Sequence, residues 1–566
     1  MKKISSLLLI FVFTPFLFAQ GFSSMQQRKL SNAISAISSL YVDSINDKKL
    51  VETALTSILK ELDPHSSYIP KEEVERVNEP LEGSFEGVGI QFQLLEDTLL
   101  VVQTISGCPA EKVGVMPGDR ILYIGNELVA SVKLQNSDIM KRLRGPKGSE
   151  VTVKIQRGGK PDLLEFKIVR DKIPIYSVDA TYMIGKDIGY IKINNFGNST
   201  VQEFEKAFAT LQKAGMKSLI LSLQGNGGGY LNAAIQLADE FLSADKLIVY
   251  TQGLNQPKSD AESTAAGKFE KGKLIVLVDE YSASASEIVS GALQDWDRAI
   301  IVGRRSFGKG LVQRQFPLID GSMMRLTTAR YYTPTGRCIQ KPYKDGIVKY
   351  EHDLLDRYNN GELLHADSIH FPDSLRYQTL NLKRTVYGGG GIMPDIFVPL
   401  DTTKFTDFHR RIVARGIVNK VCVQYIDQNR TELKKKYSTF EKFKKEFQVD
   451  DAFLNSLKSE AKKDKMSTSK LSKDSVVLQL ISNKKDDAKQ GEQNLSLDSS
   501  KNDKDSIDLK EFEKSKPLIK LQLKALIARD LWEMNEYYMI MDAENESLQK
   551  AIQIMQTPRK YEEILK

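Results

Sequence analysis

One segment of the sequence places three hydroxyl groups and one amine where acyl-transfer chemistry could occur. Within residues 279–313, Ser282, Ser284 and Ser286 follow one another closely, and Lys309 lies farther on between two glycines. A serine hydroxyl becomes a good nucleophile when a neighbouring base takes its proton, and a lysine amine can be that base only if burial keeps it neutral. The residues next to Lys309 are glycine, phenylalanine and leucine rather than acids. The segment therefore favours a serine nucleophile with a lysine base.

The positions of the histidines make lysine the stronger candidate. None of the five lies in residues 176–345, so a Ser-His-Asp triad would have to recruit its base from another part of the chain. They are His65, His352, His365, His370 and His409. A free lysine amine has a pKa of about 10.4, so a useful neutral fraction near pH 7 requires a shift of about two or three units. Without such burial, the lysine would be an ordinary surface residue and the serines would only cap and pack a helix.

A turn between a strand and a helix is expected to present these serines. Residues 276–278 are an apolar run typical of a buried strand, and residues 286–293 have the composition of a helix start. The first N–H groups of a helix have no partners inside it, so such a junction can lift a hydroxyl above the sheet and leave an amide free beside it. That amide could stabilise an oxyanion.

Three or four structural units are expected, because 566 residues exceed what one hydrophobic core usually supports. Residues 25–80 have apolar positions at helical spacing, and residues 84–171 consist of short β runs. Residues 176–400 alternate apolar strands with amphipathic helices, which is typical of an α/β fold. Residues 403–566 are helical and rich in lysine.

Within the last unit, residues 458–512 or thereabouts are expected to be largely a solvated or flexible linker. Lysine, aspartate, serine and glutamine dominate there, and no aromatic residue lies between Phe453 and Phe512. A final helical stretch, residues 517–555, is expected to dock on the body or on a second subunit. A homodimer is therefore one arrangement that the sequence leaves open.

The N-terminus predicts export. Two lysines, an apolar run at residues 7–18 and then Ala19-Gln20 have the layout of a signal peptide, predicted over residues 1–19. The run is short against the roughly 20 residues that a spanning helix needs, so no stable membrane insertion is expected after signal removal. The expected location is the periplasm or cell envelope.

Charge and cysteine content exclude other classes. The net charge of +7 is spread over 80 basic and 73 acidic residues, which does not favour nucleic-acid binding, and no zinc-like ligand spacing is present. Only Cys108, Cys338 and Cys422 occur, far apart, so no disulfide framework is predicted and a single bridge stays unassigned.

The motifs SASASE, GALQD and GRRSFGKG, followed by a glutamine, closely resemble those of the C-terminal processing, or tail-specific, serine peptidases. In that family the middle serine is the nucleophile and the lysine 25 residues later is the base, which implies Ser284 and Lys309. The glutamine that orients the lysine falls on Gln313. Ser286 then becomes a helix-start residue rather than a second nucleophile. The resemblance implies no metal or cofactor.

The same resemblance implies an oxyanion hole built from backbone amides. Its glycine turn falls on Gly229, with Gly228 as a near alternative, and the second donor is Ala285, which follows the nucleophile. The family usually has Asp-Leu-Arg where this chain has Ser222-Leu223-Gln224. An ion pair near the turn is therefore expected to be absent, with an effect on local stability rather than on catalysis, because the donor is backbone.

The β-rich unit resembles a PDZ domain. The run Gly87, Val88, Gly89 and Ile90 opens a strand, and the turn PGDRI and the run GPKG follow. This implies a loop whose amides bind a free carboxylate and a strand edge that takes an extended peptide. By the same register, His65 lies in the helical region before this domain and is expected to be structural.

Taken together, the resemblance implies an α/β multi-domain protein. Its Clp-peptidase/crotonase-like βα core would carry an inserted PDZ domain, an insertion at about residues 345–385, and helical N- and C-terminal regions. The expected activity is that of an exported serine endopeptidase that recognises free apolar C-termini of proteins and cleaves through an acyl-enzyme. The alternative is a non-catalytic PDZ scaffold or adaptor. An acyl-thioester enzyme, suggested by fold analogy alone, lacks any coenzyme signature.

Overall fold

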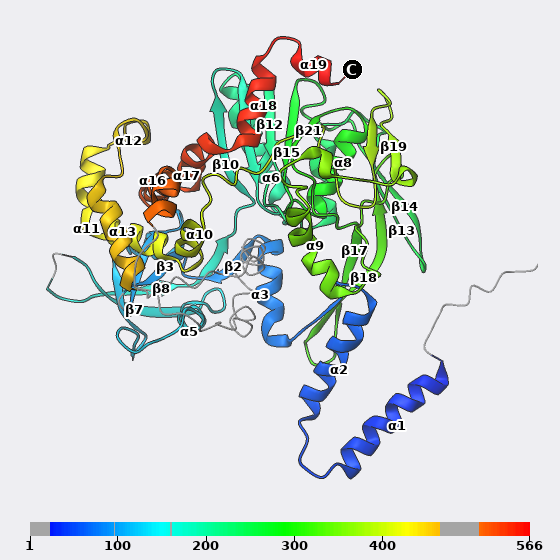
Figure 1. Ribbon diagram of the computed structural model, residues 1–566. Coiled ribbons are helices and arrows are strands. Elements are labelled where there is room, and N and C mark those ends of the chain that lie inside the picture. Colours follow the sequence, from blue (N-terminus) through cyan, green and yellow to red (C-terminus); the bar gives the residue numbers. More distant parts are fainter. Residues whose placement is uncertain (1–22, 96, 159–160, 464–508, 566) are drawn as a thin grey trace, which may run out of the picture.

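The structure, a computed structural model, describes residues 23–95, 97–158, 161–463 and 509–565 (Figure 1). The predicted signal peptide, residues 1–19, lies outside the described residues, as does most of the predicted linker. The ends of that linker prediction are wrong, because residues 458–463 belong to α13 and residues 509–512 begin α16. Both ends contain apolar residues that are buried against neighbouring helices, such as Ala461 and Phe512.

Two helices, α1 (Ser24–Leu40) and α2 (Asp47–Leu62), extend away from the rest of the molecule (Figure 1). They confirm the helical spacing, but α1 buries no residue, and Leu30 and Ile34 are more than half exposed. The short strand β1 (Ser67–Ile69) and α3 (Lys71–Glu82) then lead into the β-rich module.

The β-rich module is a six-stranded antiparallel sheet in the order β3-β4-β5-β7-β8, with β6 (Glu127–Leu128) paired to β5. Its strands are β3 (Ile90–Leu95), β4 (Thr98–Thr104), β5 (Arg120–Ile124), β7 (Glu150–Gln156) and β8 (Leu164–Val169). Two helices complete it, α4 (Pro109–Lys112) and α5 (Asn136–Leu143). At its neck, β2 (Ser84–Gly87) pairs with β9 (Asp171–Pro174). The module has its own core, which includes Val101, Ile121, Ile139 and Val153.

The α/β unit is built on a six-stranded sheet in the order β10-β11-β12-β15-β16-β21, in which β10 is antiparallel and the other pairings are parallel. The strands are β10 (Val178–Ile184), β11 (Ile188–Ile193), β12 (Ser218–Ser222), β15 (Leu274–Val278), β16 (Ile300–Gly303) and β21 (Ile396–Phe397). The helices are α6 (Thr200–Lys213), α7 (Leu231–Asp239) and α8 (Ala285–Asp295). The predicted alternation is thus confirmed.

A second sheet adjoins this unit and was not anticipated. It has the order β1-β18-β13-β14, with β17 on β18, and all of its pairings are antiparallel. Its further strands are β13 (Leu247–Gly253), β14 (Gln256–Glu262), β17 (Leu311–Pro317) and β18 (Met323–Tyr332). Much of β14 is exposed, so its sequence lacks the apolar run that reveals a buried strand.

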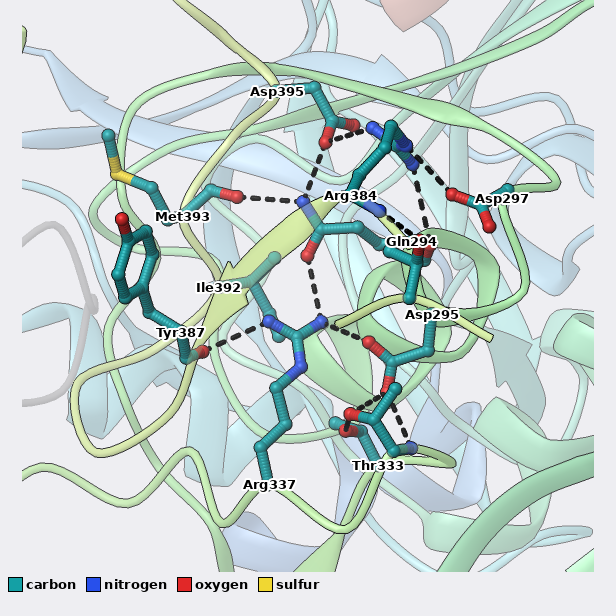
Figure 2. A network of polar contacts seen from close by, with 12 residues as sticks. Gln294, Asp295, Asp297, Thr333, Arg337, Arg384, Tyr387, Ile392, Met393 and Asp395 are labelled. Carbon is teal, nitrogen blue, oxygen red and sulfur yellow. Dashed lines mark hydrogen bonds and ion pairs between the residues drawn. The ribbon is translucent and has the colours of Figure 1, made fainter. Parts of the chain in front are cut away.

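The predicted insertion forms α9 (Ile347–Asn359), two short 3₁₀ turns, η1 (Ala366–Ser368) and η2 (Asp373–Leu375), and a small hairpin of β19 (Arg376–Gln378) and β20 (Thr385–Tyr387). The segments before and after the insertion both contact the C-terminal end of α8 (Figure 2). There Arg337, which precedes the insertion, donates to Gln294 Oε1, and the Gln294 amide donates to Asp395, which follows it.

The C-terminal region is a helical unit with its own core, which includes Phe408, Cys422, Phe443 and Leu523. Its helices are α10 (Asp407–Ala414), α11 (Ile417–Lys436), α12 (Phe440–Glu446), α13 (Asp451–Lys463), α16 (Leu509–Leu531), α17 (Met534–Met541), α18 (Glu546–Gln556) and α19 (Lys560–Ile564), with the 3₁₀ turn η3 (Asp542–Glu544) before α18. Helix α18 lies against the six-stranded sheet of the α/β unit, where Leu548 and Ile554 are buried (Figure 1). The final stretch therefore docks on the body of the same chain. Among the described residues, no helix is long and apolar enough to cross a membrane.

Candidate active site

Ser284 occupies the turn between β15 and α8, where it is the N-cap of the helix. Its backbone is in a sparsely populated region, with φ of 55° and ψ of −111°. Such a conformation costs a non-glycine residue free energy, so the surrounding contacts must hold it in place. The helix starts one residue earlier than predicted, and Ser286 is buried and donates to the carbonyl of Asn226. Ser286 is thus a packing residue of the first helical turn.

The carboxylate of Glu287 joins the serine turn to the lysine loop. The main-chain amides of Ser284 and Lys309 both donate to its Oε2, at 2.8 and 2.9 Å. The Gly308 amide and the Ser306 hydroxyl donate to Oε1, at 2.7 and 2.5 Å. Glu287 is fully buried, and burial raises the pKa of this carboxyl while the four donors oppose that shift. Because every partner is a donor, the site is shaped for the ionised form.

The side chain of Lys309 lies beside Gln313. Lys309 Nζ donates to Gln313 Oε1 at 3.0 Å, and Gln313 Nε2 donates to the carbonyl of His65 at 2.6 Å. The hydroxyl of Tyr331, which is fully buried, contacts the carbonyls of both Ser284 and Lys309, at 3.1 and 2.5 Å. The structure thus brings together the three residues that the motifs singled out.

His65 contributes to this site in a way that sequence reasoning missed. Its carbonyl fixes Gln313, and its ring nitrogen Nε2 lies 2.8 Å from the hydroxyl of Tyr350 in α9. The expected structural role is consistent with these contacts. Its proximity was hidden because it precedes Gln313 by 248 positions and carries no local signal.

The glycine turn distinguishes between the two oxyanion candidates. The Gly228 amide is occupied, since it donates to the Asn226 side chain at 2.8 Å. Gly229 forms a parallel bridge with Phe196 in which the flanking residues make the hydrogen bonds, through the Gly228 carbonyl and the Tyr230 amide. Its own N–H therefore points to the other side, and no acceptor for it is found among the described residues. The amide of Ala285, the first residue of α8, also has no acceptor among the described residues.

The segment Ser222-Leu223-Gln224, where the family's usual residues are missing, is held by other contacts. Lys192 Nζ donates to the Gln224 carbonyl at 2.8 Å, and the side-chain amide of Asn545 donates to Gln224 Oε1 at 2.9 Å. The next amide, that of Gly225, donates to Asp279. The turn is therefore held in part by the C-terminal unit.

Residues 87–90 form the loop of the β-rich module that is predicted to bind a carboxylate, and two of its carbonyls are hydrogen-bonded within the module. The carbonyls of Val88 and Gly89 accept from the Ala110 and Ile105 amides, at 2.9 and 3.0 Å. Gly89 has φ of 79°, and a Cβ there would collide with Cys108, so glycine is required. The amides of Val88 and Gly89 have no acceptor in the described part of the chain. Ile90 begins β3, which is an edge strand of its sheet.

The far end of α8 is anchored by a buried polar network (Figure 2). Arg337 and Asp295 form an ion pair of 2.6 Å with both side chains fully buried. Gln294 also donates to the Met393 carbonyl, and Arg384 bridges Asp297 and Asp395. The GALQD motif supplies two of these residues, Gln294 and Asp295. Its role is to fix the helix that carries Ser284.

Comparisons with known proteins agree with these features. The model of "Peptidase family S41" matches residues 187–349, that of the "PDZ domain" matches residues 87–168, and a "Family of unknown function (DUF8443)" matches residues 408–483 and 492–533. The carboxy-terminal processing protease CtpB of Bacillus subtilis is 36% identical over 357 residues, which cover 60% of this chain and 74% of that protein.

A carboxy-terminal-processing protease of Bartonella bacilliformis is also 36% identical, over 348 residues that cover 61% of this chain and 79% of that protein. Among solved structures, a photosystem II D1 C-terminal processing protease is 27% identical and covers 55% of this chain and 83% of its own. The TM-score of that match is 0.33.

Proposed function

Because the chain belongs to peptidase family S41 and is a carboxy-terminal processing serine protease with a PDZ domain, we propose that it is an exported endopeptidase that works through an acyl-enzyme on Ser284. Its membership of a peptidase family removes the reason to regard the chain as a non-catalytic scaffold. The family, the α/β multi-domain fold and the PDZ domain are those that the sequence motifs predicted.

In this mechanism Ser284 attacks the scissile carbonyl, and Lys309 accepts the hydroxyl proton and returns it to the leaving amine. Gln313 orients the Lys309 amine, and the amides of Gly229 and Ala285 hold the oxyanion. The observation that carries the proposal is the pair of contacts on Lys309. Its amine is placed by Gln313, and its backbone is bound to the carboxylate that also binds the backbone of Ser284.

The PDZ domain supplies substrate recognition in this proposal. Such domains add a peptide to a sheet edge and bind its terminal carboxylate to loop amides. The open amides of Val88 and Gly89 and the edge strand β3 support binding of a free, apolar protein C-terminus here. Export to the periplasm or cell envelope is supported by the signal-like pattern of residues 1–19.

The test compares wild type with Ser284→Ala and Lys309→Ala, using an unfolded reporter that ends in apolar residues. Both variants should lose cleavage while their unfolding transitions stay close to that of wild type. The reporter with an amidated C-terminus should be cleaved more slowly by wild type. Activity in Ser284→Ala would refute the nucleophile, and equal cleavage of the two reporters would refute tail recognition.

A further inference from the structure

The C-terminal segment of residues 532–545 makes polar contacts with both the PDZ domain and the catalytic sheet. At its start, the carbonyl of Trp532 accepts from Gln103 of β4 at 2.7 Å. Farther along, Tyr538 donates to Asp179 of β10, at 3.1 Å. At its end, Asn545 donates to Gln224. The segment therefore runs from the PDZ domain past β10 of the six-stranded sheet. Its last residue, Asn545, contacts the start of the glycine turn that follows β12.

The side chain of Asn545 holds three partners through two atoms. Its Oδ1 accepts from the Leu548 amide at 3.2 Å and so caps α18. Its Nδ2 donates to Gln224 Oε1 at 2.9 Å and, over a longer distance of 3.4 Å, to Asp542 Oδ1. Helix α18 is fixed on the sheet, with Leu548 and Ile554 almost fully buried. The donor offered to Gln224 therefore has a fixed position relative to the sheet.

Gln224 is the first residue of the turn that ends at Gly229. Its carbonyl is bound by Lys192 from β11 and its side chain by Asn545 from α18. The residues between contain three glycines, two of which, Gly225 and Gly228, have positive φ. A glycine-rich turn resists displacement poorly on its own, so its geometry depends on the contacts that hold it. Asn226 anchors its middle through the carbonyl of Ile193 and the hydroxyl of Ser286, and Gln224 anchors its start.

We propose that Asn545 is a positioning residue for peptide hydrolysis, which acts through Gln224 on the turn that carries the Gly229 amide. This inference rests on the proposed role of Gly229 as an oxyanion donor. The side-chain pair replaces, in this chain, the support expected from the family's missing Asp-Leu-Arg residues. The C-terminal helical unit is then part of the catalytic apparatus and not only a covering layer.

The experiment separates this role from capping. Asn545→Ser keeps a good N-cap but is too short to reach Gln224, and Gln224→Ala removes the other partner without touching α18. Each should lower kcat on a short reporter about two- to tenfold, as expected for the loss of one hydrogen bond, and should leave KM unchanged. The double variant should be no slower than the slower single variant, because both remove the same contact.

Two controls complete the test. Gln224→Glu keeps the acceptor and should retain kcat near wild type. Gln549→Ala removes a hydrogen bond of the same helix to the Asp542 carbonyl and should leave kcat unchanged. If Asn545→Ser fails to fold, the comparison of Gln224→Ala with Gln224→Glu still decides.

The outcomes are distinct. Wild-type kcat in Asn545→Ser and Gln224→Ala, a raised KM with unchanged kcat, or additive losses in the double variant would overturn the positioning role. If Ser284→Ala is inactive in the same assay, only this inference has then failed. Activity in Ser284→Ala would instead refute the proposed function itself.

Discussion

The main-chain amides of Ser284 and Lys309 donate to one and the same atom, Oε2 of Glu287. A single buried carboxylate therefore sets the distance between the backbone of Ser284, the proposed nucleophile, and that of Lys309, the proposed base. Ser284 has a positive φ, which the surrounding contacts must hold in place. Glu287 can do this because the carboxylate that accepts from the Ser284 amide is itself fixed by donors from residues 306–309.

The first prediction concerns this carboxylate. In Glu287→Gln, the side-chain nitrogen would face amide and hydroxyl donors and leave at least one of them unpaired. We expect the free energy of unfolding to fall by about 1–3 kcal/mol. We expect kcat to fall about 100-fold, because a small misplacement of reacting groups is costly.

The matched control for this prediction is Glu240→Gln. Glu240 is also a buried carboxylate bonded to a backbone amide, that of Lys268, and it has no contact with the serine turn. Chemical denaturation and steady-state kinetics on both variants decide. Equal kcat values in Glu287→Gln and Glu240→Gln would contradict a role of Glu287 in aligning the dyad.

Local motifs were sufficient to single out Ser284, Lys309 and Gln313, which the structure connects through shared contacts. These three residues lie within 30 consecutive positions that form α8, β16 and the start of β17, so the motifs that mark them occur together in the sequence. His65 and Asn545 reach the same site from distant parts of the chain through single hydrogen bonds. A contact of this kind leaves no periodicity or motif behind, so only the folded structure reveals it.

The apolar pattern of the N-terminal helices predicted their secondary structure but not their burial. The spacing of Leu30 and Ile34 predicted helix correctly, but it did not reveal that the stripe would stay exposed within the chain. Periodicity identifies a face that tends to be covered without identifying what covers it. The antiparallel sheet was missed for the opposite reason, because exposed strands such as β14 lack an apolar run.

The second prediction concerns Gln313, which accepts from Lys309 and donates to His65. Gln313→Ala removes both contacts, so kcat should fall about tenfold because the amine is no longer aligned. Binding of a tail peptide to the PDZ domain, measured by fluorescence anisotropy, should be unchanged. Weakened tail binding with normal kcat would contradict the orienting role.

The variant Gln313→Glu sharpens this prediction. It keeps the acceptor but places a negative charge beside the Lys309 amine, which stabilises the protonated, inactive form. The pH at which activity is half-maximal should therefore move upward relative to wild type. An unchanged pH profile would mean that Gln313 does not contact the catalytic base.

The third prediction uses two glycines of the same turn. Gly229 has φ of 153°, and an added Cβ would collide with the Phe196 carbonyl, so Gly229→Ala must displace the turn. Gly225 has φ of 74° but open space around a Cβ, so Gly225→Ala should cost only about 1 kcal/mol of stability.

For Gly229→Ala we expect kcat to fall about 100-fold or more, as for the loss of an oxyanion donor. Circular dichroism and thermal unfolding establish that each variant is folded before kcat is compared. If Gly225→Ala lost as much activity as Gly229→Ala at equal stability, the oxyanion assignment would be wrong.

The fourth prediction concerns the pH dependence of stability in the C-terminal unit. His409 is buried, and burial lowers the pKa of its imidazole below the ordinary value of 6.5, while a hydrogen bond to Gln522 partly opposes this. A lowered folded-state pKa means that the folded protein prefers neutral histidine. The stability that His409 contributes is therefore fully present above pH 6.5 and is lost as the pH falls through the lower folded-state pKa.

His409→Asn removes the titrating group and keeps a polar side chain at this position. The free energy of unfolding should fall less steeply in this variant than in wild type between about pH 7 and pH 5, even if the variant is less stable at every pH. The slope of the free energy of unfolding against pH is the decisive quantity. A packing defect alone would lower this free energy at every pH without changing the slope. Parallel curves for the two proteins would show that His409 is not protonated on unfolding in this range.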